Sequence, residues 1–176
     1  LEKAAAKGDV GAVNDIGVIH ETKGNYDKAM EFYQLAALFG SEVAIHNAGN
    51  LYETGKGVDA NYALAMILYR RSAKQNYPHA FYKIATFYQY GKSVKKDEKK
   101  AFEWAMKGVH LELKTKEESA CLVTVGYYYE MGIGVKKNYN KALKYYSLAA
   151  ERGSAVGKFD AALIHLYKKN SKKHTR

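Results

Sequence analysis

The feature of this sequence that most constrains its fold is an internal repeat. A glycine or alanine followed three residues later by a tyrosine or histidine recurs along the chain, with the small residues 32, 36, 41 and 36 positions apart: Gly17/His20, Gly49/Tyr52, Ala85/Tyr88, Gly126/Tyr129 and Ala162/His165. A second small residue follows the first four pairs, as Ala29, Ala65, Ala101 and Ala142. Such a period indicates supersecondary units that cannot bury their apolar faces alone and must stack on their neighbours.

Each repeat is predicted to be a pair of antiparallel helices. The small residues of the first helix let a neighbouring helix approach closely, and the second helix places apolar residues at helical spacing. Glycine-containing turns join the two helices, as "TGKGV" at 54–58, "YGKSV" at 90–94 and "MGIGV" at 131–135, because a glycine just past a helix end suits the left-handed C-cap. The sequence therefore predicts an all-α fold, a right-handed α-solenoid of stacked antiparallel helix hairpins.

The register of the repeat also predicts the organisation of the chain. We expect one solenoid domain over residues 1–176, beginning with the end of a preceding repeat at 1–11. Four repeats follow at 12–43, 44–79, 80–120 and 121–156, with an insertion at 109–119 in the third. The first helix of a fifth repeat is expected at 157–168, followed by a basic, disordered tail at 169–176.

The best-matching segment, "VTVGYYYEMGIGVKKNYNKALKYYSLAAERGSAVG" at 123–157, resembles the Sel-1-like repeat, a relative of the tetratricopeptide repeat. Residues 44–80 match nearly as well, and the resemblance covers the chain except its basic tail. It implies a helical solenoid that acts as a scaffold or adaptor for other proteins rather than as an enzyme. The first repeat departs from the pattern, because "ETKGNYDKA" at 21–29 lacks the "GxGV" turn and is shorter and closer to the tetratricopeptide form.

No catalytic or cofactor-binding motif is found in the sequence. Paired cysteines, HExxH and acidic metal-binding loops do not occur, and the one cysteine, Cys121, falls where other repeats have a buried alanine. We expect neither an enzyme nor a cofactor or metal. No stretch of about 18 apolar residues is present to span a membrane. Because the chain begins at Leu1 rather than Met, it is expected to be a fragment or a processed form, and its localisation stays open.

The expected binding surface is the concave face, which the first helices of successive repeats line. A stripe opposite the small residues and the tyrosines is not part of the repeat pattern, so its side chains are expected to serve a partner. Amides and carboxylates beside aromatic residues suit an extended peptide. We call these residues the concave stripe: Asn14, Val18, Glu21, His46, Asn50, Glu53, Tyr82, Thr86, Gln89, Tyr127 and Glu130.

A formal net charge of +10 leaves a second partner class open. Lysines concentrate in the turns and second helices of the later repeats, so RNA, DNA or another acidic surface is the alternative partner. Residues 168–176 alone carry five Lys or Arg and no acid, which weakens this alternative for the folded part. The favoured prediction is therefore a non-enzymatic scaffold that binds a peptide or a partner domain in the groove, with self-association through the uncapped last helix as a further expectation.

Overall fold

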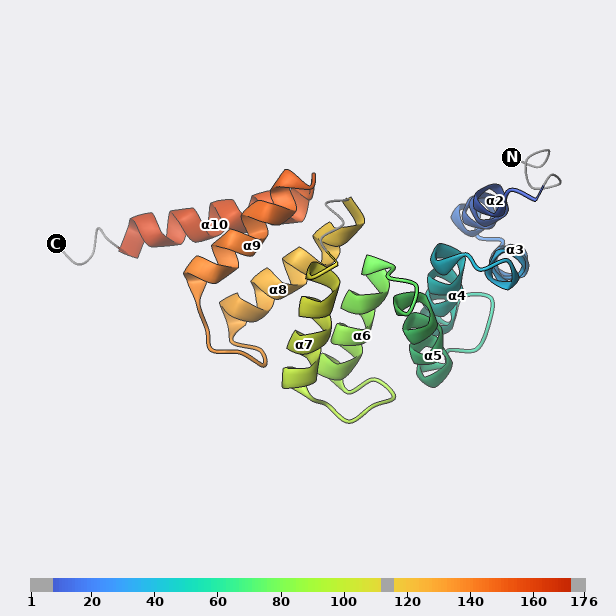
Figure 1. Cartoon of the computed structure of the whole chain (residues 1–176), viewed down its shortest axis with the longest axis horizontal. Coiled ribbons are helices and arrows are strands. Elements are labelled where there is room, and N and C mark those ends of the chain that lie inside the picture. Colours follow the sequence, from blue (N-terminus) through green and yellow to red (C-terminus); the bar gives the residue numbers. More distant parts are fainter. Residues whose placement is uncertain (1–7, 112–115, 172–176) are drawn as a thin grey trace. The chain divides into compact units, whose positions relative to one another are not determined.

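The computed structural model describes residues 8–111 and 116–171, and in this part of the chain it is entirely helical. The helices follow one another as α2 (Val10–Thr22), α3 (Tyr26–Leu38), α4 (Glu42–Thr54), α5 (Tyr62–Ala73), α6 (Pro78–Tyr90), α7 (Glu98–Val109), the short 3-10 helix η1 (Lys116–Glu118), α8 (Ser119–Met131), α9 (Tyr139–Glu151) and α10 (Ala155–Ser171) (Figure 1). The all-α prediction is confirmed for these residues.

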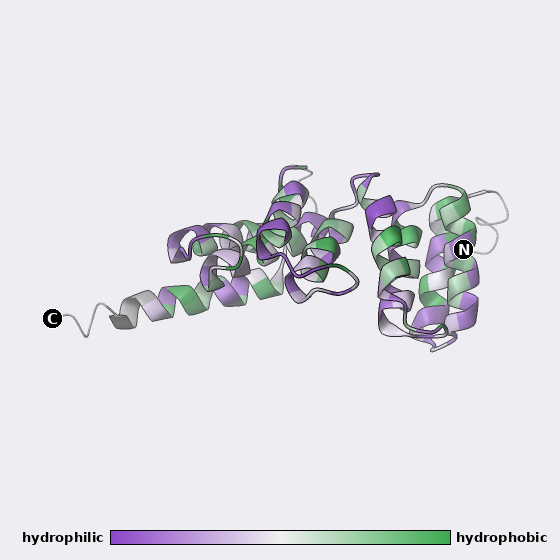
Figure 2. Ribbon diagram, turned by 90° about the horizontal axis from the view of Figure 1, so that it is seen from below, coloured by the Kyte–Doolittle hydropathy of each residue, from purple (hydrophilic) through white to green (hydrophobic). Residues whose placement is uncertain are grey.

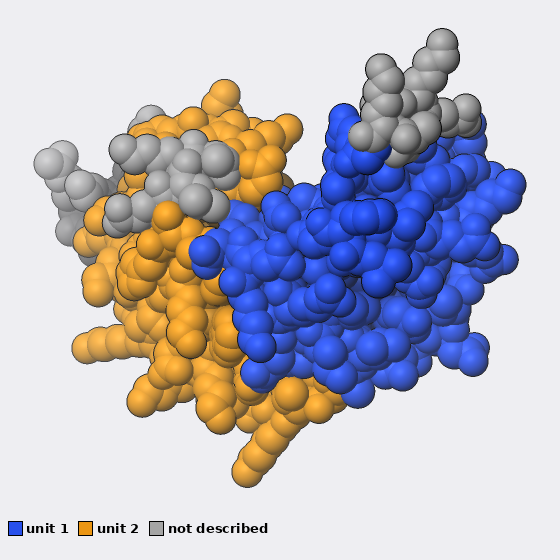
Figure 3. All heavy atoms as spheres, turned by 45° about the vertical axis from the view of Figure 1, so that its right-hand side comes forward, with its two compact units in different colours: residues 1–80 blue, residues 81–176 orange. Residues whose placement is uncertain are grey.

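The chain divides into two compact units, Leu1–Ala80 and Phe81–Arg176 (Figure 3). In unit 1, α2 pairs with α3 and α4 pairs with α5, and the two hairpins pack through α3 and α4. The core of unit 1 gathers small residues around large ones, with Tyr33, Ala36, Ala44 and Leu51 fully buried. Apolar and polar residues alternate along each helix, as the ribbon coloured by hydropathy shows (Figure 2), because one face of each helix is buried and the other is not.

Unit 2 repeats the same arrangement with α6 to α10. Helix α8 packs on α9, α9 on α10, and α7 on α8, while Phe81 of α6 lies 5.9 Å from Trp104 of α7 between ring centroids. The core of unit 2 combines Ala85, Ala101, Val125, Tyr128 and Tyr146, all at most 1% exposed. Small residues again allow the helices to approach, so the packing logic predicted from the repeat holds in both units.

The three glycine-containing turns have one shared geometry, which fixes how each second helix begins. In each turn the C-cap glycine has a left-handed backbone, with φ of 67° at Gly55, 72° at Gly91 and 79° at Gly132. The residue at the N-cap of the second helix then donates its backbone N–H to a tyrosine carbonyl of the first helix, at 2.7–2.9 Å, and accepts the N–H three residues on with its side chain: Asn61, Asp97 and Asn138. The predicted role of the glycines is confirmed.

Four segments predicted from the sequence lie close to an observed helix or partly outside the described residues. The first helix of the fifth repeat is α10, which starts at Ala155 and runs to Ser171, beyond the expected end at 168. The expected remnant at 1–11 and the insertion at 109–119 lie partly outside the described residues, at 1–7 and 112–115, and the last part of the tail, 172–176, also lies outside them.

Candidate partner-binding surfaces

A tyrosine of the second helix donates a hydrogen bond to a carboxylate of the first helix in three repeats. Tyr33 Oη lies 2.6 Å from Glu21 Oε2, and Tyr146 Oη lies 2.7 Å from Glu130 Oε2. Tyr69 Oη lies 2.8 Å from both Glu53 Oε2 and Asn50 Oδ1. Burial raises the pKa of Tyr33 and of Tyr146, and the hydrogen bond to the carboxylate raises each pKa further. The phenols therefore stay protonated and hold the carboxylates in place.

The same tyrosine rings lie against the glycine of the first helix. A Cβ atom added at Gly17 would lie 2.7 Å from the ring of Tyr33, one at Gly49 would lie 2.8 Å from the ring of Tyr69, and one at Gly126 would lie 2.7 Å from the ring of Tyr146. Real Cβ atoms do not approach a ring so closely, so glycine is required wherever the tyrosine is present. Each of these repeats thus contains a fitted set of Gly, Glu and Tyr.

The third repeat replaces all three members of this set together. Its equivalents are Ala85, Gln89 and Ala105, so the position of the second-helix tyrosine is occupied by an alanine. Tyr128 of the next repeat is fully buried in the same cluster and donates its hydroxyl to Gln89 Oε1 at 3.1 Å. Burial is the main cause of the raised pKa of Tyr128. The amide of Gln89 therefore takes the place of the carboxylate, and its partner comes from the neighbouring helix.

These hydrogen bonds correct one premise of the sequence analysis. The identities of the concave-stripe residues were expected to be independent of the fold. Four of them, however, accept a hydrogen bond from the hydroxyl of a buried tyrosine: Glu21, Glu53, Gln89 and Glu130. The sequence already indicated this structural role. The acidic residue always follows the glycine by four positions, and it is replaced by Gln89 only in the repeat where Ala85 replaces the glycine. A carboxylate that accepts one hydrogen bond can accept others, so these residues can still bind a partner, and that binding stays a prediction.

Three members of the concave stripe are buried rather than open to solvent: Asn14 at 7%, His46 at 4% and Gln89 at 8% exposure. Asn14 Oδ1 accepts a hydrogen bond from Asn47 Nδ2 at 3.1 Å, which ties α2 to α4. The ring of His46 lies 5.2 Å from Tyr69 and 5.1 Å from Tyr77 between centroids. The expectation that these three side chains face a groove is wrong, because helix neighbours cover them.

The remaining stripe residues are accessible and divide between the two units. Val18, Asn50, Glu21 and Glu53 belong to unit 1, where Val18 is 38% exposed and the others are half-buried. Unit 2 presents Tyr127, which is 37% exposed, together with the half-buried Tyr82, Thr86 and Glu130. Whether these residues form one binding surface stays a prediction.

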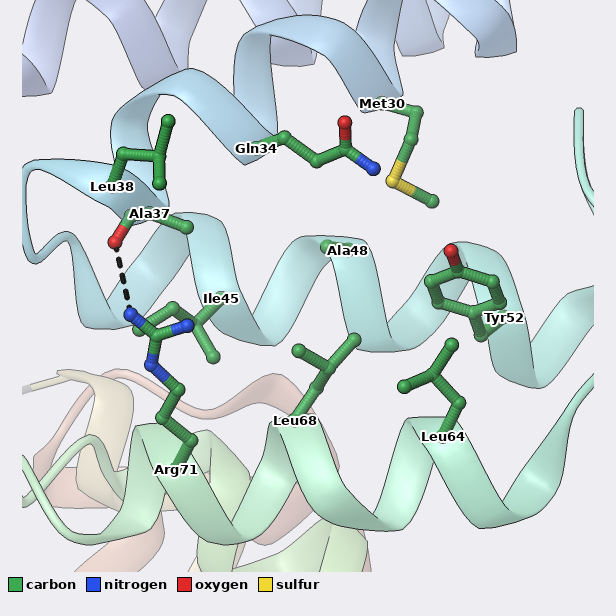
Figure 4. A pocket seen from close by; sticks show the side chains of 10 residues that line it. All are labelled: Met30, Gln34, Ala37, Leu38, Ile45, Ala48, Tyr52, Leu64, Leu68 and Arg71. Carbon is green, nitrogen blue, oxygen red and sulfur yellow. Dashed lines mark hydrogen bonds between the residues drawn. The ribbon is translucent and has the colours of Figure 1, made fainter.

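Unit 1 also contains an open, mostly apolar pocket that the sequence analysis did not predict. It has a volume of about 360 Å³ and lies between α3 and α5, with α4 as its floor (Figure 4). Arg71 donates from Nη2 to the carbonyl of Ala37 at 3.2 Å and stands at one end. An available signal was Leu64, an apolar residue where the third and fourth repeats carry Lys100 and Lys141. The pocket could accept an apolar side chain beside a carboxylate.

Residues capable of catalysis or metal binding are few in the part of the chain that the structure describes. No group of three or more His, Cys, Asp or Glu residues is placed there to hold a metal ion. Cys121 is fully buried against Gly108, and burial raises the pKa of its thiol to about 12. A thiol with such a pKa is a poor nucleophile at neutral pH, which fits the interpretation of Cys121 as a packing residue. No described helix is both long and apolar enough to cross a membrane.

Comparison with known proteins gives the family. The Sel1 repeat model matches residues 17–38, 43–77, 78–107 and 120–154, in register with the four helix hairpins. The chain belongs to the Sel1 repeat family. Proteins built from Sel1 repeats are generally non-catalytic scaffolds that bind other proteins. The fold class predicted from the repeat and the resemblance stated above are thereby confirmed.

Several relatives share these Sel1 repeats. The chain is 30% identical over 132 residues to protein sel-1 homolog 2 of Mus musculus and 31% identical over 154 residues to the chitin synthase regulator SKT5 of Saccharomyces cerevisiae. These alignments cover 73% and 83% of this chain but only 19% and 21% of the relatives. The chain therefore spans about a fifth of the length of the curated relatives that it matches.

Solved structures agree with the helical repeat fold. A Sel1 repeat protein from Oxalobacter formigenes is 29% identical, with a TM-score of 0.72 over 86% of this chain and 62% of that one. A protective antigen of uropathogenic Escherichia coli with the same repeat fold is 23% identical, with a TM-score of 0.57 over 93% of this chain and 42% of that one. The second likeness extends to the fold alone.

Proposed function

We propose that this chain is a non-enzymatic protein-interaction scaffold whose concave stripe binds an extended segment of a partner protein. The observation that carries the proposal is found within each unit: buried tyrosines hold carboxylates of the first helices in place. Glu21 and Glu130 each accept a hydrogen bond from a tyrosine hydroxyl through Oε2, and a carboxylate has capacity for further donors. The partner segment would supply backbone amides and Lys or Arg side chains to these acceptors.

The tyrosine hydrogen bonds favour binding because they order the acceptors before the partner arrives. Immobilising a flexible side chain on binding costs roughly 0.5–1.5 kcal/mol, and a glutamate already held by a tyrosine avoids part of this cost. Each exposed ion pair then contributes about 0.2–1 kcal/mol. Tyr82 and Tyr127 supply aromatic surface in the same unit, and aromatic anchors usually carry most of the binding energy of an interface.

The test uses a displayed library of random peptides, selected on the folded chain. Selected peptides should be rich in Lys or Arg beside apolar residues, and their affinity is then measured by fluorescence anisotropy. The double variant Tyr82→Ala with Tyr127→Ala should bind the selected peptide at least about tenfold more weakly, which is a loss of about 1.4 kcal/mol. The matched control is Tyr90→Ala with Tyr167→Ala, two exposed tyrosines of unit 2 outside the stripe.

Circular dichroism must show that both variants stay helical. The proposal is contradicted if the stripe variant keeps its affinity for the selected basic peptide within about twofold, or if the selection yields no basic peptide. A basic peptide that loses affinity equally in the stripe variant and in the control would also contradict it, because the loss would then come from aromatic surface in general.

A further inference from the structure

The turns that join the two helices of each repeat differ in charge although their backbones agree. The second repeat has Asp59 and Ala60 just before its N-cap residue, whereas the third and fourth repeats have lysine at both positions, as Lys95, Lys96, Lys136 and Lys137. One turn into the second helix, Leu64 is likewise replaced by Lys100 and Lys141. Because all three turns make the same backbone hydrogen bonds, the repeat fold does not require these lysines.

The two lysine-bearing turns adjoin each other within unit 2. The turn between α8 and α9 packs its backbone directly on the start of α7, since a Cβ atom added at Gly134 would meet the carbonyl of Glu98 and would lie 3.0 Å from Cα of Lys99. This contact joins the lysines of the third repeat to those of the fourth. We call the result the lysine surface: Lys95, Lys96, Lys99, Lys100, Lys136, Lys137 and Lys141, all exposed.

Aromatic rings support several of these lysines. The ammonium groups lie over rings at 5.8 Å for Lys100 and Tyr88, 5.1 Å for Lys141 and Tyr129, and 4.8 Å for Lys137 and Tyr139. Two ion pairs within the third repeat neutralise part of the charge, Lys96 with Glu98 at 2.8 Å and Lys100 with Asp97 at 3.4 Å. The seven lysines still outnumber these two acids, so the surface is strongly positive and partly ordered.

The charge is a property of unit 2 and not of the chain as a whole. Residues 81–176 hold 20 of the 28 Lys and Arg and nine of the 18 Asp and Glu, a formal net charge of +11. Residues 1–80 hold eight Lys or Arg and nine Asp or Glu, a formal net charge of −1. Solubility alone would not concentrate lysine at equivalent positions of two adjacent repeats and leave the preceding repeat with aspartate, alanine and leucine there.

We propose that the lysine surface binds an Asp- and Glu-rich segment of a partner protein. All seven cations are lysines, which act as point charges toward any anionic group rather than as bidentate donors. The rings of Tyr88, Tyr129 and Tyr139 lie beneath lysine ammonium groups, while single-stranded nucleic acids need open ring faces for base stacking. The covering of these rings favours carboxylates over a single-stranded nucleic acid. The proposal shares with the scaffold function only the assumption that the partner is a protein, and it uses a different surface.

The experiment replaces the paired lysines in the turns of the third and fourth repeats with the Asp and Ala found at the same positions of the second repeat. The lysine-surface variant is Lys95→Asp, Lys96→Ala, Lys136→Asp and Lys137→Ala, which the repeat fold tolerates at Asp59 and Ala60. A control variant lowers the formal net charge by the same six units at exposed positions elsewhere: Lys23→Ala, Lys28→Asp, Lys74→Ala and Lys158→Asp. The probe is a fluorescent twelve-residue peptide of alternating Asp and Glu, with a peptide of Asn and Gln as its neutral counterpart.

At about 0.15 M salt, the acidic peptide should bind the natural sequence and the control variant within about threefold of each other. The lysine-surface variant should bind it at least about tenfold more weakly, and the neutral peptide should not bind. Equal loss in both variants would overturn the proposal, because net charge alone would then explain binding. Absence of acidic-peptide binding would also overturn it. So would tighter binding of a twelve-nucleotide RNA or of phosphatidylserine vesicles, because the surface would then serve another class of partner.

Discussion

The hydrogen bond between Tyr128 and Gln89 offers the sharpest test of how the third repeat is built. Tyr128 is fully buried and Gln89 is 8% exposed, and the two atoms lie 3.1 Å apart. Tyr128→Phe keeps the ring and removes only the hydroxyl, which leaves the amide of Gln89 without that donor in a site that water hardly reaches. Tyr127→Phe changes the adjacent residue, which is 37% exposed, and serves as the matched control.

The expected cost follows from burial. Leaving a buried acceptor without its partner costs about 1–3 kcal/mol, whereas replacing both partners by apolar groups of similar shape is nearly neutral. We therefore expect Tyr128→Phe to lower the free energy of unfolding by about 1–3 kcal/mol and Gln89→Leu to lower it by a similar amount. The double variant should be more stable than the sum of the two losses predicts, with a coupling energy of about 1–2 kcal/mol. Tyr127→Phe should change stability by less than about 0.5 kcal/mol.

The assay is urea unfolding followed by tryptophan fluorescence. The chain has a single tryptophan, Trp104 of α7, which packs against the core cluster that contains Tyr128, so the signal reports unit 2 even if the units unfold separately. Equal effects of Tyr128→Phe and Tyr127→Phe would refute the reasoning. A coupling energy near zero would also refute it, because Tyr128 and Gln89 would then act independently.

Three further predictions follow from the packing and the charges. Gly126→Leu should lower stability by at least about 1–3 kcal/mol in the same urea assay, because even a Cβ atom would lie 2.7 Å from Tyr146; an unchanged midpoint would contradict the glycine fit. Raised pKa values at Tyr33 and Tyr146 mean that above about pH 10 the unfolded chain loses phenol protons that the folded chain keeps. Stability should then fall by up to about 1.4 kcal/mol per pH unit for each tyrosine, with a smaller fall in the Tyr33→Phe variant. A constant free energy of unfolding from about pH 9 to 11 would disprove this. The exposed face of α10, with Phe159 64% exposed, should promote self-association that Phe159→Lys reduces, and sedimentation velocity showing one monomer at all concentrations would exclude it.

The sequence was sufficient to predict the helices because each signal acts locally. The repeat spacing, the C-cap glycines and the apolar stripes specify where a helix begins, ends and packs, and tertiary contacts reinforce the same choice in every repeat. The burial of Asn14 and His46 could not be predicted in this way. Whether a polar side chain on the far side of a first helix is covered depends on the next hairpin, as the hydrogen bond from Asn47 to Asn14 shows. The pocket between α3 and α5 depends on hairpin spacing for the same reason.

Comparing the repeats with one another separates two kinds of recurrent residue. Glycine, glutamate and tyrosine change together, since the repeat with Ala85 also has Gln89 and Ala105, and the structure explains this by direct contact between the three positions. Residues that are replaced only together depend on one another through contact, and they serve the fold. The lysines at 95 and 136 behave differently, because they replace Asp59 while the backbone hydrogen bonds of the turn stay the same. These lysines recur in adjacent repeats, and no residue of the turn hydrogen bonds changes with them. A binding partner outside the chain explains such a charge better than the fold does.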